Sequence, residues 1–278
     1  MRSRQRQNQS DWVAHDQPTA GVERIEAFFQ GNAYAMHRHD TYAIGRTLAG
    51  VQSFHYQKSM RHSLPGHTIV LHPDEPHDGQ AGTHEGFRYR MIYIEPALFH
   101  DVLEGKTLPF IDGGVSTDPR LHYALEVLLP RMSSPLQPLE QDEALAELAL
   151  ALAAVSNASP VSASRCFASA RRAREYLHAH LDQQVTLDEL EQATGRERWR
   201  LIRDFRAFYS TSPYRYLTMR RLEVARKRML QGCTLIDAAM GAGFADQSHM
   251  TRHFTKTYGM PPGRWLQIAR AQANCVVI

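Results

Sequence analysis

Cysteine is scarce in this sequence of 278 residues and occurs only at Cys166, Cys233 and Cys275. None of these residues stands at the close spacing of a zinc finger, and three scattered cysteines do not form a disulfide framework. We therefore expect neither a secreted disulfide-rich fold nor a cysteine-ligated zinc domain. The pattern fits a protein of a reducing compartment.

Long apolar runs are also missing. The longest, residues 148–155, is far shorter than the ~20 residues that a membrane-spanning helix needs. The basic start of the chain is not followed by the apolar segment of a secretory signal. These absences predict a soluble, cytoplasmic protein without a membrane partner.

Charge is nearly balanced over the whole chain, at a formal net +3, but it is unevenly distributed. Residues 1–160 carry 13 Lys or Arg against 19 Asp or Glu, whereas residues 161–278 carry 19 against 10. A basic C-terminal part beside an acidic front part indicates that only the C-terminal part meets a polyanion. A chance asymmetry or a solvated basic face would give the same counts. Charge alone therefore does not show that the C-terminal part binds a polyanion, and the motifs are needed as well.

Residues 21–115 have a sequence pattern typical of β-structure, with short apolar runs separated by Gly, Pro, Asp and His. Within residues 87–94, aromatic or apolar side chains first alternate with Arg88 and Arg90, as in a strand with one apolar face. Many short strands with turn signals predict a small barrel or sandwich. The polar residues 1–20 are expected to be flexible.

Residues 116–155 change to a helical period. One helix is expected from Asp118-Pro119, and a second from near Leu139. The second places Leu145, Leu148 and Leu152 on one stripe. This stripe could pair two subunits in a homodimer or pack on the chain's own barrel, and the sequence does not choose between them. Residues 156–164, rich in Ser and Ala, are the expected linker.

The remaining residues, 165–278, have only helical patterns, and two units share one layout. In each, a short helix and a tight turn precede a second helix with separate apolar and polar faces, starting near residue 197 and at Asp246. A connecting helix over residues 213–231 would be roughly 28 Å long and could hold the two reading helices about one turn of DNA apart. The expected helices are 165–181, 186–194, 197–209, 213–231, 234–241, 246–258 and 262–271.

The polar faces of the two reading helices carry side chains suited to DNA. Arginine can bind guanine through two hydrogen bonds, glutamine can bind adenine, and hydroxyl groups bind phosphate oxygens. One such unit could be an ordinary helical hairpin, but two units in a basic domain favour DNA binding. A nucleic-acid binder without sequence preference is an alternative. The predicted DNA-binding residues are Trp199, Arg203, Arg206, Gln247, Ser248, Thr251, Arg252 and Lys256.

This part of the chain resembles AraC/XylS-type transcription regulators. The resemblance rests on the stretch 241–249 followed by Arg252-His-Phe254, Lys256, Gly259 and Pro261, and on an upstream match from residue 187 to 220. It implies a sequence-specific regulator of promoter DNA, with a second copy of itself and RNA polymerase as further partners. Two positions depart from the family pattern: Glu197 replaces a frequent Ser, and Ser210 replaces a usual Gly.

Histidine is concentrated at the other end, since 11 of the 15 lie in residues 1–122. The spacing of His37 and His39 resembles the first motif of cupin barrels, and the segment ending at His77 resembles the second. Alternate residues of a strand share a face, so three imidazoles could meet and could hold iron, manganese or zinc. Cupin enzymes usually add a Glu, and here only Asp40 is available. A metal-dependent cupin enzyme with a helical appendage is therefore the alternative, and we predict no catalytic residue, metal or cofactor.

AraC-type regulators commonly carry a cupin-like domain, so the two resemblances agree. Arg46 would suit a carboxylate group on an effector. The predicted fold is α+β: a cupin-like β-barrel followed by helices, then an all-α C-terminal domain with two helix-turn-helix units joined by a long helix. The predicted function is transcription regulation in which a small-molecule effector in the barrel modulates promoter binding. The predicted effector-binding residues are His37, His39, Tyr42, Arg46 and His77.

Overall fold

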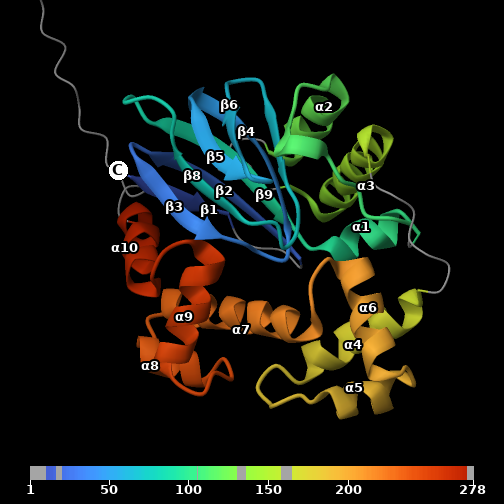
Figure 1. Cartoon of the computed structure of the whole chain (residues 1–278). Helices are drawn as coiled ribbons and strands as arrows, with labels where there is room; N and C mark the ends of the chain where they lie inside the picture. Colours follow the sequence, from blue (N-terminus) through green and yellow to red (C-terminus); the bar gives the residue numbers. More distant parts are fainter. Residues whose placement is uncertain (1–10, 17–20, 105, 130–135, 158–164, 274–278) are drawn as a thin grey trace, which may run out of the picture.

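The computed structural model describes residues 11–16, 21–104, 106–129, 136–157 and 165–273. Figure 1 shows two halves: an N-terminal half with elements β1 to α3, and a helical half with elements α4 to α10. Among the described residues, no helix is both long and apolar enough to cross a membrane. The predicted α+β class is confirmed.

The N-terminal half is built from two sheets whose strands all pair antiparallel. The larger sheet contains, in spatial order, β1 (Trp12–His15), β2 (Val22–Phe29), β9 (Phe87–Ile94), β4 (Tyr42–Gly50), β7 (Thr68–Leu71) and β10 (Val115–Ser116). The smaller contains β3 (Asn32–His37), β8 (His77–Ala81), β5 (Gln52–Tyr56) and β6 (Ser59–Ser63). This arrangement confirms the predicted cupin-like barrel.

Strand β9 shows how side-chain alternation builds two cores. Phe87, Tyr89 and Met91 belong to one buried cluster, together with side chains of the smaller sheet. Ile92 and Ile94 point to the opposite face and join a second cluster with the helices. Successive side chains of a strand point to opposite faces, so the alternation predicted for residues 87–94 is confirmed.

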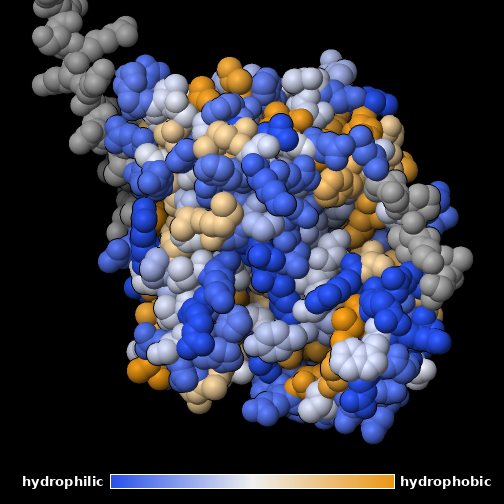
Figure 2. Space-filling view, viewed as in Figure 1, coloured by the Kyte–Doolittle hydropathy of each residue, from blue (hydrophilic) through white to orange (hydrophobic). Residues whose placement is uncertain are grey.

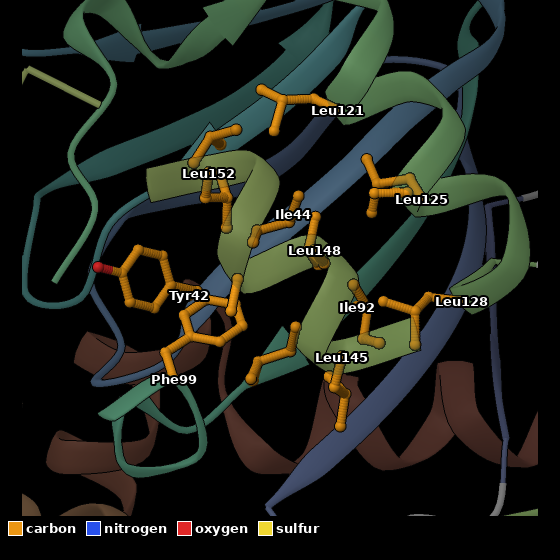
Figure 3. Close-up of a cluster of buried hydrophobic side chains, with 14 of the residues drawn as sticks. Tyr42, Ile44, Ile92, Phe99, Leu121, Leu125, Leu128, Leu145, Leu148 and Leu152 are labelled. Carbon is orange, nitrogen blue, oxygen red and sulfur yellow. The ribbon is translucent and has the colours of Figure 1, made fainter. Parts of the chain in front are cut away.

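Helices α2 (Pro119–Leu128) and α3 (Pro138–Val155) pack against the outer face of the larger sheet (Figure 3). Leu145, Leu148 and Leu152 of α3 are 5%, 0% and 0% exposed and join a cluster with Ile44 and Ile92 of the sheet. Of the two alternatives for the leucine stripe, the structure shows packing on the chain's own barrel. These three side chains offer no free surface to a second subunit.

The observed segments differ from the expected ones in two places, and one expected segment lies partly outside the described residues. Residues 12–15 form β1, which pairs with β2 and buries Val13, so the expectation of flexibility is wrong for this stretch of residues 1–20. Helix α1 (Pro96–Val102) lies inside the segment expected to be all barrel, and it begins where Pro96 occupies the first turn. Of the linker expected at 156–164, residues 158–164 lie outside the described part of the chain.

The helical half follows the sequence prediction closely. Its helices are α4 (Phe167–Ala179), α5 (Leu187–Thr194), α6 (Arg198–Tyr209), α7 (Pro213–Leu230), α8 (Leu235–Met240), α9 (Gln247–Tyr258) and α10 (Pro262–Ala273). In Figure 1, α7 runs beneath the barrel and joins α4, α5 and α6 at one end to α8 and α9 at the other. Each predicted helix is present, with ends that differ by at most two residues.

Candidate DNA interface and effector pocket

The first helix-turn-helix unit consists of α5, the turn at Gly195 and α6. Gly195 adopts a left-handed conformation, at φ 65°, which glycine accepts without steric penalty. Glu197 then caps α6 because its carboxylate accepts hydrogen bonds from the backbone N–H groups of Trp199 and Arg200. The departure at Glu197 therefore preserves the capping function that Ser commonly performs.

The exposed face of α6 carries the residues predicted to contact DNA. Leu201 and Phe205 are fully buried and attach the helix to its own domain. Trp199 is 61% exposed, and Arg203 and Arg206 are also exposed. A single exposed aromatic side chain is ordinary on a monomer surface. It is the two exposed arginines on the same face of α6 that make this face a candidate surface for DNA.

The second unit consists of α8, the turn 241–243 and α9. Asp246 caps α9 by accepting from the His249 N–H at 2.7 Å, and Met250 and Phe254 are fully buried. The predicted contact residues of this unit occupy the remaining surface of the helix. Ser248, Arg252 and Lys256 are exposed, whereas Gln247 and Thr251 are half-buried.

The two units are held apart by one continuous helix. Helix α7 has 18 residues and is therefore about 27 Å long. Figure 1 places α6 and α9 at its opposite ends. In the face shown in Figure 2, the surface of the helical half is mostly hydrophilic, with scattered apolar patches.

A pocket of about 340 Å³ lies between the N-terminal half and the helical half. One wall comes from β1, β2 and β3, and the other from α7, α9 and α10. Its lining is mainly apolar, with a charged side. The apolar lining includes Val13, Ile25, Met219, Trp265 and Ile268, and the charged lining includes Glu23, Asp40, Glu95, Glu223 and Arg226.

Three of the five predicted effector residues come together at this pocket. His37 and His39 line it, and the ring of His77 lies 4.3 Å from that of His37 and 4.8 Å from that of His39. Tyr42 instead donates its hydroxyl hydrogen to the Pro109 carbonyl oxygen, within the core.

Arg46 also lies away from the pocket. It contacts Glu126 and the Leu129 carbonyl oxygen at the end of α2. Tyr42 and Arg46 occupy alternate positions of β4, so both point to the helix-covered face of the sheet. The expectation that they lie at the pocket is therefore wrong.

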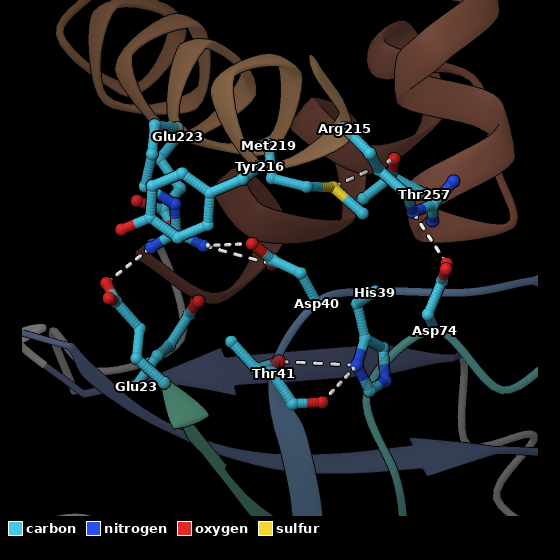
Figure 4. Close-up of polar contacts among 12 residues, drawn as sticks. Glu23, His39, Asp40, Thr41, Asp74, Arg215, Tyr216, Met219, Glu223 and Thr257 are labelled. Carbon is cyan, nitrogen blue, oxygen red and sulfur yellow. Dashed lines mark hydrogen bonds and ion pairs between the residues drawn. The ribbon is translucent and has the colours of Figure 1, made fainter. Parts of the chain in front are cut away.

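Ion pairs between α7 and the barrel form part of the pocket's surroundings (Figure 4). Arg220 contacts Asp40 at 3.0 Å, and Arg215 contacts Asp74 at 2.7 Å. A third pair joins Arg226 to Glu23, with one contact at 2.9 Å. Sequence reasoning missed these pairs, since the partners are more than 140 residues apart in the chain.

The environment of the pocket shifts the titration of its acids in opposite directions. Burial opposes the ionisation of Glu23, but Arg226 and His15 together hold its pKa well below the usual range. Burial raises the pKa of Glu223 to about 7, although Arg220 favours its charged form. Among the acids of the pocket, Glu23 is thus held in its charged form, whereas burial favours the protonated form of Glu223.

Both reading helices contact the N-terminal half. Backbone hydrogen bonds join the end of α9 to β3 and to the residue that follows it: Ala35 N–H donates to Gly259 O, and Arg38 N–H donates to Lys256 O. At the other end of α7, His100 of α1 hydrogen-bonds the Phe208 carbonyl oxygen of α6. These contacts link each reading helix directly to the N-terminal half.

Comparison with known proteins agrees with this architecture. Residues 19–149 match the AraC-like ligand binding domain, and residues 190–268 match a helix-turn-helix domain. The HTH-type transcriptional regulator YbfI of Bacillus subtilis is 29% identical over 237 residues, which are 81% of this chain and 86% of YbfI. The HTH-type transcriptional regulator GbdR of Pseudomonas aeruginosa is 31% identical over 87 residues, 31% of this chain and 24% of GbdR.

A solved structure of ToxT from Vibrio cholerae shares the fold. It superposes with a TM-score of 0.63 at 10% identity, over 93% of this chain and 99% of ToxT. The two domain matches fall on the two structural halves, and the relative YbfI extends across both. The chain therefore belongs to the AraC-type transcription regulators, with a cupin-like ligand-binding domain followed by a helix-turn-helix DNA-binding domain.

Proposed function

We propose that both helix-turn-helix units bind promoter DNA and that a small, mostly apolar molecule in the pocket changes this binding. One observation carries the proposal: residues of both halves line the pocket. An occupant touches the ligand-binding and DNA-binding domains at once, so its binding energy depends on their relative position. Such differential binding is what an allosteric effector requires.

The proposed DNA contacts are the exposed side chains of α6 and α9. Trp199, Arg203 and Arg206 serve the first half-site, and Gln247, Ser248, Thr251, Arg252 and Lys256 serve the second. With α7 about 27 Å long, the two helices suit successive major grooves on one side of the duplex. One chain would then read two grooves without a palindrome.

The pocket supports an apolar effector with one polar group. Its volume of about 340 Å³ falls within the range of small-molecule sites, roughly 300–1,000 Å³. ToxT, which shares only the fold, is described in a structure with a bound unsaturated fatty acid. An unsaturated fatty acid is therefore the first probe, with its carboxylate near Arg226 and Lys227, the Arg and Lys side chains of the pocket lining.

The proposal also includes the protein's binding partners and its location in the cell. Promoter binding implies a cytoplasmic protein that acts with RNA polymerase, and no catalytic step is included.

We assign the homodimer interface to the outer faces of α2 and α3, where apolar side chains are exposed. These are Tyr123, Val127, Leu139 and Leu150. Light scattering of a Leu150→Glu variant tests this interface, because a monomeric variant beside a dimeric parent is the expected result.

Footprinting on the DNA that flanks the protein's own gene tests DNA recognition. The full chain is assayed at two salt concentrations with competitor DNA. The expected result is a protected tract of ~17–20 bp per monomer on one face of the duplex, retained at the higher salt. Protection that is equal on all sequences and disappears with salt would instead identify a nucleic-acid binder without sequence preference.

A further inference from the structure

The charges on the acidic side of the pocket are unevenly paired. Asp40, Glu95 and Glu223 all contact the guanidinium of Arg220. Nη2 of Arg220 contacts both carboxylate oxygens of Asp40, at 3.0 and 3.1 Å. Nη1 contacts Glu95 and, at 3.0 Å, Glu223. Three carboxylates therefore share one positive charge.

The neighbouring arginine of α7 does not balance this excess. Arg226 pairs with Glu23, with one contact at 2.9 Å. Its guanidinium also lies over the rings of Tyr258 and Trp265, at 5.0 and 4.9 Å from their centres. Around these two arginines four carboxylates meet two positive charges, and all four carboxylates line the pocket.

Glu223 is the carboxylate of this group that an occupant can reach. Its side chain is 39% exposed, compared with 5% for Asp40 and 15% for Glu95. Glu223 belongs to the pocket lining, so at least part of this exposed surface faces the pocket. A group that contacts Glu223 also lies close to Glu95, because both carboxylates contact the same nitrogen of Arg220.

The titration of Glu223 reflects the excess of negative charge. Burial is the main cause that raises the pKa of Glu223 to about 7, although Arg220 opposes it. The nearby carboxylates of Asp40 and Glu95 raise the pKa further. A proton on Glu223 is one way to reduce the repulsion between these acids. A cationic group of an occupant is another, and it can contact Glu223 from the pocket.

The rest of the lining suits an organic cation. Aromatic side chains line the pocket together with the carboxylates and several aliphatic residues. The aromatic residues are Tyr34, Tyr93, Tyr258 and Trp265. A positive charge is attracted to the face of an aromatic ring, and Arg226 already makes this contact in the pocket. The volume of about 340 Å³ leaves room for an apolar body attached to the charged group.

A carboxylate group on the occupant finds less support in the same lining. It would depend on Arg226 and Lys227. Arg226 is already paired with Glu23, so a second carboxylate would compete for the same guanidinium. Lys227 is exposed to solvent, where an ion pair contributes little. The charges of the lining therefore favour a cation over an anion.

We propose that the occupant of the pocket is an amphiphilic organic cation, whose ammonium group binds Glu223 and Glu95 and whose apolar part packs against the aromatic side chains. This inference rests on the proposed function, because it names the chemical class of the effector of the same pocket. Glu223 lies on α7 of the DNA-binding domain, and Glu95 directly precedes α1 of the N-terminal half. The ammonium group thus bridges the two halves.

The test compares three probes that have the same chain length and different head groups: n-octylamine, octanoic acid and 1-octanol. At about pH 7 the first is a cation, the second an anion and the third neutral. Calorimetric titration of the full chain, below the concentrations at which the probes form micelles, measures each affinity. Octylammonium should bind as one equivalent and ~10-fold or more tightly than octanol. Octanoate should bind no more tightly than octanol.

Glu223→Gln tests the assigned contact, since it removes the charge and keeps the shape of the side chain. It should weaken the binding of octylammonium by ~10-fold or more and leave the binding of octanol unchanged. Glu175→Gln is the matched control, because it removes a surface carboxylate of α4 that pairs with Arg171. It should leave all three affinities unchanged, which would exclude a general attraction of amines to acidic surface. Circular dichroism checks that both variants fold.

The order of the three probes is measured on the wild-type protein and does not depend on any variant. Octanoate that binds as tightly as octylammonium, or more tightly, would overturn the inference, and so would failure of octylammonium to bind. A preference for the cation that persists in folded Glu223→Gln would overturn the assigned contact.

The effect on DNA distinguishes this inference from the proposed function. Octylammonium, at a concentration that saturates only the wild type, should change affinity for the footprinted fragment by ~5–150-fold, and should not do so in Glu223→Gln. Octylammonium that binds with the expected preference but leaves DNA affinity unchanged would refute the effector role and support the cation site. Absence of specific DNA binding would refute the proposed function, and titrations without DNA would still decide the charge of the occupant.

Discussion

The guanidinium of Arg220 in α7 contacts both carboxylate oxygens of Asp40, at 3.0 and 3.1 Å, and Asp40 directly follows His39. The side chains of the pair are only 3% and 5% exposed. Arg220 also contacts Glu95 and Glu223. One buried cation thus joins the DNA-binding domain to the loop that carries His39.

Asp40→Asn should destabilise the chain by about 3–5 kcal/mol, since breaking a buried ion pair leaves charge without compensation. The value should fall at the lower end, because Arg220 keeps Glu95 and Glu223 as partners. Urea unfolding measures the loss. Glu175→Gln is the matched control, since Glu175 pairs with Arg171 on the surface and its neutralisation should change little. Equal effects of the two substitutions would show that Asp40 does not hold the domains together.

Arg252→Ala should weaken binding to the cognate site by about 1–3 kcal/mol and relax discrimination at one base position. The reason is that Arg252 is exposed on α9 opposite the buried Met250 and Phe254. Binding to a set of single-base variants of the site measures the effect. Arg171→Ala, which removes the same charge from α4, should preserve the pattern of base preference. A uniform loss on every sequence would mean that Arg252 contacts only phosphate.

Leu148→Ala should destabilise the protein by about 2–5 kcal/mol, because Leu148 is fully buried between α3 and the sheet. Its oligomeric state by light scattering should not change. Leu64→Ala is the control, since Leu64 is 45% exposed, lies outside the proposed dimer interface, and its truncation should hardly affect urea unfolding. If Leu148→Ala had little effect on stability but abolished a dimer, the leucine stripe would instead pair two subunits.

The helical half was predictable because its signals are local. Caps at Thr186 and Asp246, the turn at Gly195 and the apolar spacing of each helix lie within a few residues of one another. The family resemblance also depends on a short, dense motif. Consequently the ends of the predicted helices differ from the observed ones by at most two residues.

The pocket was only partly predictable because it depends on contacts between distant segments. His37, His39 and His77 could be found from their cupin-like spacing. Tyr42 and Arg46 were chosen for their nearness in sequence, but the pleat of β4 turns both to the helix-covered face of the sheet. The wall contributed by α7, α9 and α10 could not be foreseen, since nothing in the sequence states how the two domains pack.

A buried histidine of the barrel makes stability depend on pH. The Nε2 of His72 accepts a hydrogen bond from the Ile111 N–H at 2.9 Å, and its Nδ1 lies 2.5 Å from the Tyr56 hydroxyl oxygen. Burial lowers the pKa of His72 from 6.5 to about 3. Its Nε2 cannot take a proton without losing the bond from Ile111, so the folded protein holds this ring neutral.

The direction of this pH dependence follows from the difference in protonation of His72 between the unfolded and the folded chain. Between pH 6.5 and 3 the unfolded chain protonates His72 and the folded chain does not. The free energy of unfolding should therefore fall as pH decreases through this window, by up to about 1.4 kcal/mol per pH unit from this residue. Urea unfolding from pH 7 to 4.5, with chelator present, compares the wild type with His72→Gln. The variant should be less stable at pH 7 but lose less stability on acidification, because the other histidines are common to both proteins. Parallel pH profiles would show that His72 is protonated as readily in the folded protein as in the unfolded one.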